Sequence, residues 1–225
     1  MKVALFGASG MVGAGVLIEC LADPRVESVL SVGRRPCGVT HARLREIVRS
    51  DLSDLRDLAG EFAGLDACFF CLGVSSAGMS EAAYRRVTYD LTMAVARPMA
   101  ERNPRLVFCY VSGEGTDGSE RGRSMWARVK GKTENDLFAL PFRAYAFRPG
   151  FIQPLKGVRS KTRLYQAFYD LAAPLWPLIR RLAPRHVTTS EAVGRAMLEV
   201  AARGYARRVL ENPDINALGA AAPGP

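Results

Sequence analysis

The feature that most constrains this chain is a glycine-rich turn at its very start. An apolar run, Lys2–Phe6, leads directly into the turn Gly7–Gly13, which reads GASGMVG, and a helical pattern through Val16, Leu17 and Leu21 follows. Glycine allows a tight turn and a close approach of main-chain N–H groups to a neighbouring group. The pattern predicts a strand, a turn and a helix, in which the N–H groups of the turn and of the helix N-terminus point toward the same place.

The alternation of strand and helix patterns continues along the chain. Apolar runs are separated by helical patterns, the longest at 80–101 and 124–138. Such alternation is typical of a parallel sheet covered on both faces. We expect an α/β fold: a doubly wound parallel sheet of the Rossmann type with a small C-terminal helical lobe. The predicted strands are Lys2–Phe6, Ser28–Val32, Leu44–Val48, Ala67–Leu72, Arg105–Val111 and Arg143–Phe147.

The pattern changes after Pro149 and Gly150. Residues 159–184 are basic, aromatic and interrupted by proline, and a helix is expected from Thr189 to about Ala202. The change predicts a boundary between the sheet domain and a lobe that completes the substrate pocket. The predicted parts are a dinucleotide-binding domain at 1–150, the lobe at 151–215 and a disordered tail at 216–225.

The charge is concentrated in the C-terminal third. The chain has a formal net charge of +9, and residues 143–208 carry 13 basic against 3 acidic residues. We interpret this surplus as the solvated basic face of the lobe. Contact with an anionic substrate or a membrane surface is an alternative that is not favoured. Nucleic acid is not expected as a partner, because no recognition motif accompanies the charge.

The cysteines, the histidines and the first residues exclude several classes of protein. Five scattered cysteines argue against a disulfide framework. Cys68 and Cys71 have a redox spacing, but three residues apart on a buried strand they point to opposite faces. Two histidines leave too few ligands for a zinc site, so no metal is predicted. The apolar run at the start is too short for a signal peptide. We expect a cytoplasmic protein.

The glycine-rich turn carries the first functional prediction. Its main-chain N–H groups and the positive end of the helix dipole form an anion site that suits a pyrophosphate. Because the turn lies between the first strand and the first helix of a repeating pattern, a dinucleotide is the favoured ligand. The predicted contacts in the turn are Gly7, Ser9, Gly10, Met11, Val12 and Gly13.

The spacing GxxGxxG resembles that of the short-chain dehydrogenase/reductase superfamily, in its extended, epimerase-like and atypical branches. The closest likeness is to oxidoreductases of the Tat-interacting-protein type, and it covers about residues 1–152. The resemblance implies that Asp51 and Leu52, after the third strand, meet the adenine ring. It implies an active-site serine at Ser112 and an active-site lysine at Lys130. The further cofactor contacts that it implies are Leu72, Gly73, Lys130, Pro149, Gly150 and Ile152.

The end of the second strand indicates which nucleotide is bound. A site that prefers NAD has an acid there to hold the ribose 2′-hydroxyl. This chain has Arg34 and Arg35 instead, and no acid before Glu46. A guanidinium can clamp a 2′-phosphate with two charge-assisted hydrogen bonds or stack on the adenine. We therefore predict NADP(H) as the cofactor, with NAD(H) less favoured.

The catalytic tyrosine of the resembled superfamily is missing. That superfamily has Tyr-x-x-x-Lys, and here Trp126 stands four residues before Lys130. An indole N–H donates hydrogen bonds but does not titrate, so Trp126 cannot shuttle a proton. It can still shape the pocket by stacking on a planar group. Candidate substitutes for the proton donor are Ser112, Ser124, Lys130 and water, while Tyr110 is expected to face away.

These inferences combine into one functional hypothesis with two rivals. The first is an NADP(H)-dependent oxidoreductase that reduces a small flavin-, quinone- or carbonyl-type acceptor held near Ser112, Trp126 and the lobe. The second is a non-catalytic NADPH-binding sensor or scaffold. The third is an enzyme that resembles nucleotide-sugar epimerases. The expected partner is a small-molecule substrate, and a homodimer through the long helices is left open.

Overall fold

The structure is a computed structural model that describes residues 1–153 and 183–220. A parallel sheet of seven strands, in the order β3-β2-β1-β4-β5-β6-β9, forms its centre. This is the doubly wound Rossmann-like arrangement that the sequence predicts. The strands are β1 (Lys2–Phe6), β2 (Ser28–Gly33), β3 (Leu44–Val48), β4 (Ala67–Phe70), β5 (Val107–Val111), β6 (Arg143–Arg148) and β9 (Val209–Glu211).

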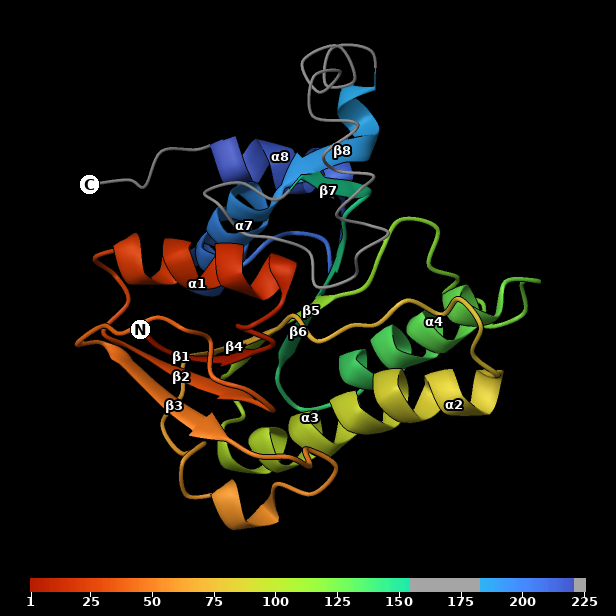
Figure 1. Ribbon diagram of the computed structural model, residues 1–225. Helices are drawn as coiled ribbons and strands as arrows, with labels where there is room; N and C mark the ends of the chain where they lie inside the picture. The colour runs from red at the N-terminus through yellow and green to blue at the C-terminus, as the bar shows by residue number, and fades with distance from the viewer. Residues whose placement is uncertain (154–182, 221–225) are drawn as a thin grey trace.

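Helices cover both faces of the sheet (Figure 1). One face is covered by α1 (Met11–Ala22), α7 (Ser190–Arg203) and α8 (Asn212–Ala220). The other is covered by α2 (Glu81–Arg85), α3 (Leu91–Arg102) and α4 (Met125–Phe138). A π-helical segment, Arg86–Asp90, joins α2 to α3, so the helix expected over 80–101 is interrupted. Two short 3-10 helices, Arg56–Leu58 and Pro184–His186, lie in the connections.

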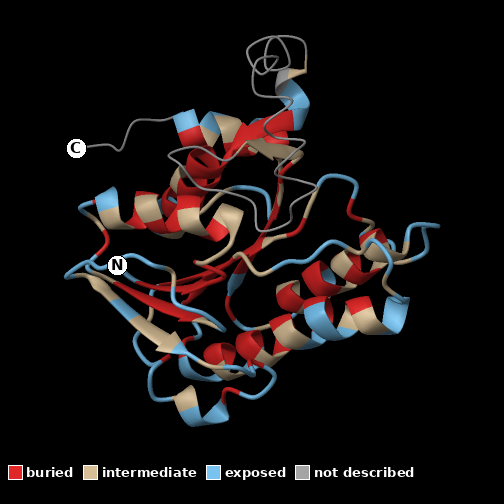
Figure 2. Ribbon diagram, viewed as in Figure 1, coloured by how far each residue is buried: buried red, intermediate tan, exposed pale blue. Residues whose placement is uncertain are grey.

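The central strands are buried on both faces, because each side chain in turn points to the opposite helical layer. Along β1, Ala4 and Phe6 pack in the core beside α3 and α4, whereas Val3 and Leu5 pack beside α1 and α7. Figure 2 shows the buried strands between the two layers. Cys68 packs in the first core and Cys71 against the second, as expected for side chains that point to opposite faces, and all five cysteines are free.

The region after Gly150 contributes to the main sheet as well as to a separate part. A small parallel pair, β7 (Phe151–Gln153) and β8 (Val187–Thr189), lies outside the sheet, but β9 joins it beside β6. Helix α7 packs closely on α1: a Cβ on Gly15 would lie 2.3 Å from the Ser190 Cβ. The domain boundary at residue 150 stays a prediction, and most of the basic, aromatic stretch 159–184 lies outside the described residues.

One part of the predicted tail is wrong. Residues 216–220 form the end of α8 rather than a disordered segment. Ile215 is fully buried, and the Gly219 carbonyl accepts a hydrogen bond of 2.5 Å from the Arg195 guanidinium, so this helix is fixed to α7. Within the described ranges, none of the helices has the length and hydropathy needed to cross a membrane.

Candidate active site

The glycine-rich turn fills the short gap between the end of β1 and the start of α1. Gly7 has a φ of +90°, and a Cβ on it would lie 2.9 Å from the main-chain carbonyl of Cys71. A Cβ on Gly13 would lie 2.1 Å from the Gly7 carbonyl oxygen. Side chains at these positions would force the turn apart. Glycine therefore lets β1, the turn and α1 pack tightly.

The N-terminus of α1 is open toward the cleft. Its N-cap, Gly10, has no side chain to accept from the N–H groups of the first turn, and that turn has no acidic residue. These amides and the helix dipole favour a negatively charged group. The turn also lies at the point where the strand order reverses, between β1 and β4. In open α/β sheets, ligands bind in the crevice at such a switch point.

A cleft of about 700 Å³ opens at this end of the sheet. It is formed by the start of α1, by the loops after β4, β5 and β6, and by one side of α4. Most of the predicted site residues line it, together with several that the sequence analysis did not single out. The predicted ones are Gly10, Met11, Val12, Leu72, Gly73, Ser112, Trp126, Lys130, Pro149, Gly150 and Ile152; the others are Cys71, Val74, Ser75, Val111, Gly113 and Glu114.

Several predicted residues lie outside this lining. Arg34 and Arg35 follow β2, are exposed, and have no ion-pair partner in the part of the chain that the structure describes. The Asp51 carboxylate accepts hydrogen bonds from the main chain and hydroxyl of Ser53, which hold its pKa below the ordinary value. Leu52 is 3% exposed in the core, so the structure does not support contact of its side chain with an adenine ring. Gly7, Ser9 and Gly13 belong to the turn itself.

Lys130 and Ser112 are joined in the cleft through the main chain. The Lys130 Nζ donates to the Ser112 carbonyl oxygen, while the Ser112 Oγ donates to the Glu134 Oε1 at 2.5 Å. The serine hydroxyl is therefore directed to a carboxylate that is 1% exposed. Burial lowers the pKa of Lys130 to about 8, and the negative charge of Glu134 acts in the opposite direction.

Glu134 belongs to a buried ionic network that sequence reasoning missed. Arg148 donates to both of its carboxylate oxygens, at 3.1 Å and 2.5 Å, and to Glu211 at 3.2 Å. The hydrogen bond to Glu134 raises the pKa of Arg148 above its ordinary value. Glu134 follows Lys130 by one helical turn, and this spacing is the only signal in the sequence that could have indicated it. The network connects α4, β6 and β9 directly beneath the cleft.

Trp126 lies one turn before Lys130 on the same side of α4 and lines the cleft. Its ring edge would lie 3.6 Å from a Cβ on Gly115. It also packs against the core on the α3 and α4 side. The side chain thus faces the pocket, as the sequence predicts, and also packs against the core.

Two more polar contacts hold the rim of the cleft. Glu114, in the loop after β5, contacts the His186 Nδ1 through its Oε1 at 2.5 Å. Asn212 accepts from the Gly150 N–H at 3.0 Å and donates to the Val187 carbonyl at 2.9 Å. Loops that follow β5 and β6 are thereby tied to the C-terminal part of the chain.

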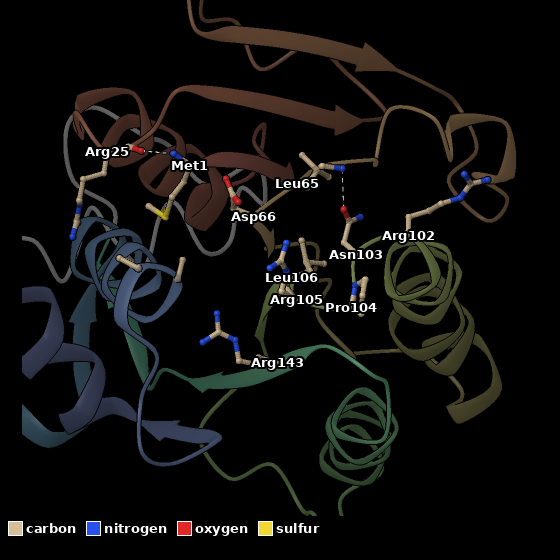
Figure 3. A pocket seen from close by; sticks show the side chains of 13 residues that line it. Met1, Arg25, Leu65, Asp66, Arg102, Asn103, Pro104, Arg105, Leu106 and Arg143 are labelled. Carbon is tan, nitrogen blue, oxygen red and sulfur yellow. Dashed lines mark hydrogen bonds between the residues drawn. The ribbon is translucent and has the colours of Figure 1, made fainter.

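The opposite end of the sheet has a cavity of about 800 Å³ (Figure 3). Arg25, Arg102, Arg105 and Arg143 line it, and none of its lining residues lies at the N-terminus of a described helix. Helix α3 instead ends there, at Arg102. Within the described ranges, no group of three or more His, Cys, Asp or Glu side chains could hold a metal ion.

Comparison with known proteins assigns the family. The model of the NAD dependent epimerase/dehydratase family matches residues 3–125, which include the glycine turn, β1 to β5 and the start of α4. The chain belongs to this family. The predicted membership of the epimerase-like short-chain dehydrogenase/reductases is confirmed.

The epimerase/dehydratase relatives include mitochondrial proteins of fungi. Protein fmp52 of Emericella nidulans is 29% identical over 174 residues, which cover 74% of this chain and 72% of the relative. Protein FMP52 of Eremothecium gossypii is 33% identical over 155 residues, which cover 68% and 66%. Both are named as mitochondrial, so the expectation of a cytoplasmic protein is contradicted. Free cysteines, on which that expectation partly rested, do not distinguish the two compartments.

Solved structures confirm the fold. MoeE5 in complex with UDP-glucose and NAD superposes with a TM-score of 0.65 at 18% identity, covering 98% of this chain and 81% of that one. DesIV, a dTDP-glucose 4,6-dehydratase from Streptomyces venezuelae with NAD bound, gives a TM-score of 0.65 at 17% identity, covering 97% and 80%. At these identities the likeness concerns the fold.

Proposed function

We propose that this chain is an NADP(H)-dependent oxidoreductase that reduces a small flavin-, quinone- or carbonyl-type acceptor. The observation that carries the proposal is the cleft at the switch point of the sheet, where the open N-terminus of α1 and the Lys130 ammonium face the same space. The family and the NAD-bound structures with this fold support a nicotinamide dinucleotide as the cofactor.

The described residues fit such a cofactor. The cradle at Gly7 and Gly13 has no room for side chains, and the first-turn amides of α1 offer donors for a pyrophosphate. Leu72, Gly73 and the turn at Pro149–Gly150 would flank the nicotinamide end. When bound, the nicotinamide supplies hydride. The chain itself binds and orients both reactants.

The preference for NADP(H) is carried by the loop after β2. Arg34 is exposed and free of described partners, so its guanidinium is available to a 2′-phosphate. The nearest acid, Glu46, accepts a hydrogen bond from the Cys37 N–H at 2.8 Å and so supports the loop. No acid directly follows β2, so a ribose 2′-hydroxyl would lack its usual carboxylate partner.

The replacement of the catalytic tyrosine favours planar acceptors. Trp126 presents an indole to the cleft and can stack on a quinone or flavin, but it cannot transfer a proton. The same replacement favours a second candidate function, a non-catalytic NADPH-binding protein. Oxidation of NADPH by an acceptor that needs little help with protonation would distinguish the oxidoreductase from the non-catalytic protein.

Two measurements test the proposal. Titration calorimetry with NADPH and NADH should give heat with both and a lower dissociation constant for NADPH. Equal dissociation constants would remove the argument for Arg34. The absorbance of reduced nicotinamide is then followed with panels of quinones, flavins and aldehydes. Oxidation of NADPH by at least one acceptor is expected, and binding without any turnover would assign the chain to the non-catalytic class.

A further inference from the structure

We propose that the Lys130 side chain is the proton donor to the acceptor oxygen, taking over the step that a tyrosine performs elsewhere in the superfamily. The inference rests on the proposed function. It also specifies the acceptor, as a carbonyl or quinone whose oxygen receives a proton when its carbon system receives hydride.

The cleft offers few side chains that could donate a proton. Among the described residues that line the cleft, the titratable side chains are Cys71, Glu114 and Lys130. Burial raises the pKa of the Cys71 thiol far above its ordinary value, which leaves it a poor acid. Glu114 is engaged with His186 at the rim. Of these three side chains, Lys130 is the one on α4, one turn from the indole that replaces the phenol.

The hydroxyl groups of the site are less suited as donors. Ser75, in the exposed loop after β4, accepts a hydrogen bond from the Ala77 N–H at 3.3 Å and has no charged partner among the described residues to activate it. The Ser112 Oγ donates its hydrogen to Glu134 at 2.5 Å, inside the protein. Ser124, the N-cap of α4, is exposed and does not line the cleft. Tyr110 is 1% exposed and packs in the core on the α3 and α4 side, where burial strongly raises its pKa.

Lys130 is held in a defined place by its surroundings. Its Nζ donates to the Ser112 carbonyl, and an ammonium has two further N–H bonds to offer. Ser112 is fixed in turn by Glu134, and Glu134 by Arg148, so these three are positioning residues. The charged and titratable groups near the amine are Glu134 on its own helix, Arg148 of β6, which pairs with Glu134, and Cys71 and Glu114 of the cleft lining, the latter in contact with His186.

The chemical step balances with these groups. The acceptor carbon gains hydride from the reduced nicotinamide, which is oxidised, and the carbonyl π pair moves to the oxygen. One N–H bond of Lys130 breaks as the new O–H bond forms, which leaves a neutral amine. The amine then takes a proton from water. Burial already lowers the Lys130 pKa to about 8, where an acid both holds and releases a proton near neutral pH.

Three variants separate this role from charge and packing. Lys130→Met removes the amine, and we expect the rate with a carbonyl or quinone acceptor to fall by about 100-fold or more. Lys130→Arg keeps a positive charge that does not titrate, so NADPH should still bind while turnover stays low. The control is Lys132→Met, which removes a lysine two residues further on that pairs with Asp136 outside the cleft and should not change the rate.

The pH dependence gives the second readout. Because the protonated amine is the active form in reduction, kcat should decline as pH rises through about 8, and this decline should be absent in the residual activity of Lys130→Arg. Nitrogen NMR of labelled lysine amines, without cofactor, should show one midpoint near 8 that Lys130→Met removes. A Lys130 midpoint at the ordinary lysine value overturns the proposal whether or not the enzyme is active.

The remaining outcomes assign the proton elsewhere. If His186→Asn removes the decline with pH and His41→Asn does not, the proton comes from the Glu114 and His186 pair and the proposal is wrong. Unchanged turnover in Lys130→Met also overturns it. Absence of calorimetric heat with NADPH would refute the proposed function instead, since the NMR midpoint does not depend on the cofactor.

Discussion

The two ends of the parallel sheet both have large cavities, but the cavities differ in the direction of the backbone around them. At the carboxyl end, about 700 Å³ is lined by the start of α1 and by the loops that follow the strands. At the amino end, about 800 Å³ is lined by four arginines and by segments that precede the strands (Figure 3). Size alone would favour the amino end.

The difference lies in what the helices present. A helix N-terminus offers free N–H groups, whereas a C-terminus offers carbonyl oxygens with a partial negative charge. Arg102 lies in the last turn of α3, and Arg25 pairs with Asp23 and Glu199 at 2.6 Å and 2.8 Å, so these cations stabilise the fold at the amino end. At the two ends of this sheet, the helix terminus and not the number of arginines distinguishes the candidate site from the other cavity.

The largest expected effect on NADPH binding comes from a side chain placed in the glycine-rich turn at the carboxyl end of the sheet. Gly13→Ala would put a Cβ within 2.1 Å of the Gly7 oxygen and displace the turn. NADPH binding should weaken by more than about 1,000-fold, roughly 4 kcal/mol, in calorimetry. Thermal unfolding of the same sample checks that the variant is folded. A folded variant that keeps wild-type affinity would show that the turn does not hold the cofactor.

The next largest effect is expected from the ion pairs that lie at the two ends of the sheet. Glu134→Ala removes the acceptor of the Ser112 hydroxyl and the buried, bidentate partner of Arg148, which keeps only the half-exposed Glu211. We expect the free energy of unfolding to fall by about 3 kcal/mol. Glu199→Ala at the amino end leaves Arg25 its second acid and should cost about 1 kcal/mol. Urea denaturation measures both. Equal losses would mean that the Glu134 network contributes no more to the free energy of unfolding than the ion pair at the amino end.

A smaller effect is expected at the far ribose. Arg34→Ala should weaken NADPH binding by about 10-fold, or 1.4 kcal/mol, and leave NADH binding unchanged. Arg56→Ala, which removes an exposed arginine paired with Asp54, is the matched control. Parallel losses for both nucleotides would point to general charge attraction and not to a 2′-phosphate contact.

The smallest effect should come from the amino end. Arg105→Ala and Arg143→Ala remove two exposed arginines of that cavity, and neither should change the dissociation constant of NADPH beyond the error of calorimetry. A clear loss of affinity in either variant would mean that part of the cofactor binds at the amino end of the sheet, contrary to the site proposed at the carboxyl end.

The sequence predicted the features that depend on local pattern. The glycine turn, six of the strands and the helices at α1 and α4 follow from hydrophobic periodicity and glycine spacing, which act over a few residues. The grouping of Ser112, Trp126 and Lys130 in one cleft was expected from the resemblance to the short-chain dehydrogenase/reductases, not from local pattern.

Features that depend on distant partners could not be predicted in this way. Strand β9 is only three residues long and is recognisable only through its pairing with β6. The direction of the Ser112 hydroxyl depends on Glu134 of α4 and Arg148 of β6, which are far from it in the sequence. The Leu52 side chain packs among apolar neighbours in the core, although the family resemblance implied that it contacts the adenine ring.

The hydrogen bonds of Asn212 have a consequence for biosynthesis. This side chain holds the Gly150 turn from 62 residues further along the chain, next to the strand that completes the sheet. A nascent chain can pair β1 with β2 and β4 early, and the Glu114 N–H can already bond the Pro149 carbonyl when β6 forms. The Gly150 N–H, in contrast, gains its partner only after Asn212 has been synthesised, so this side of the rim is completed later than the glycine-rich turn.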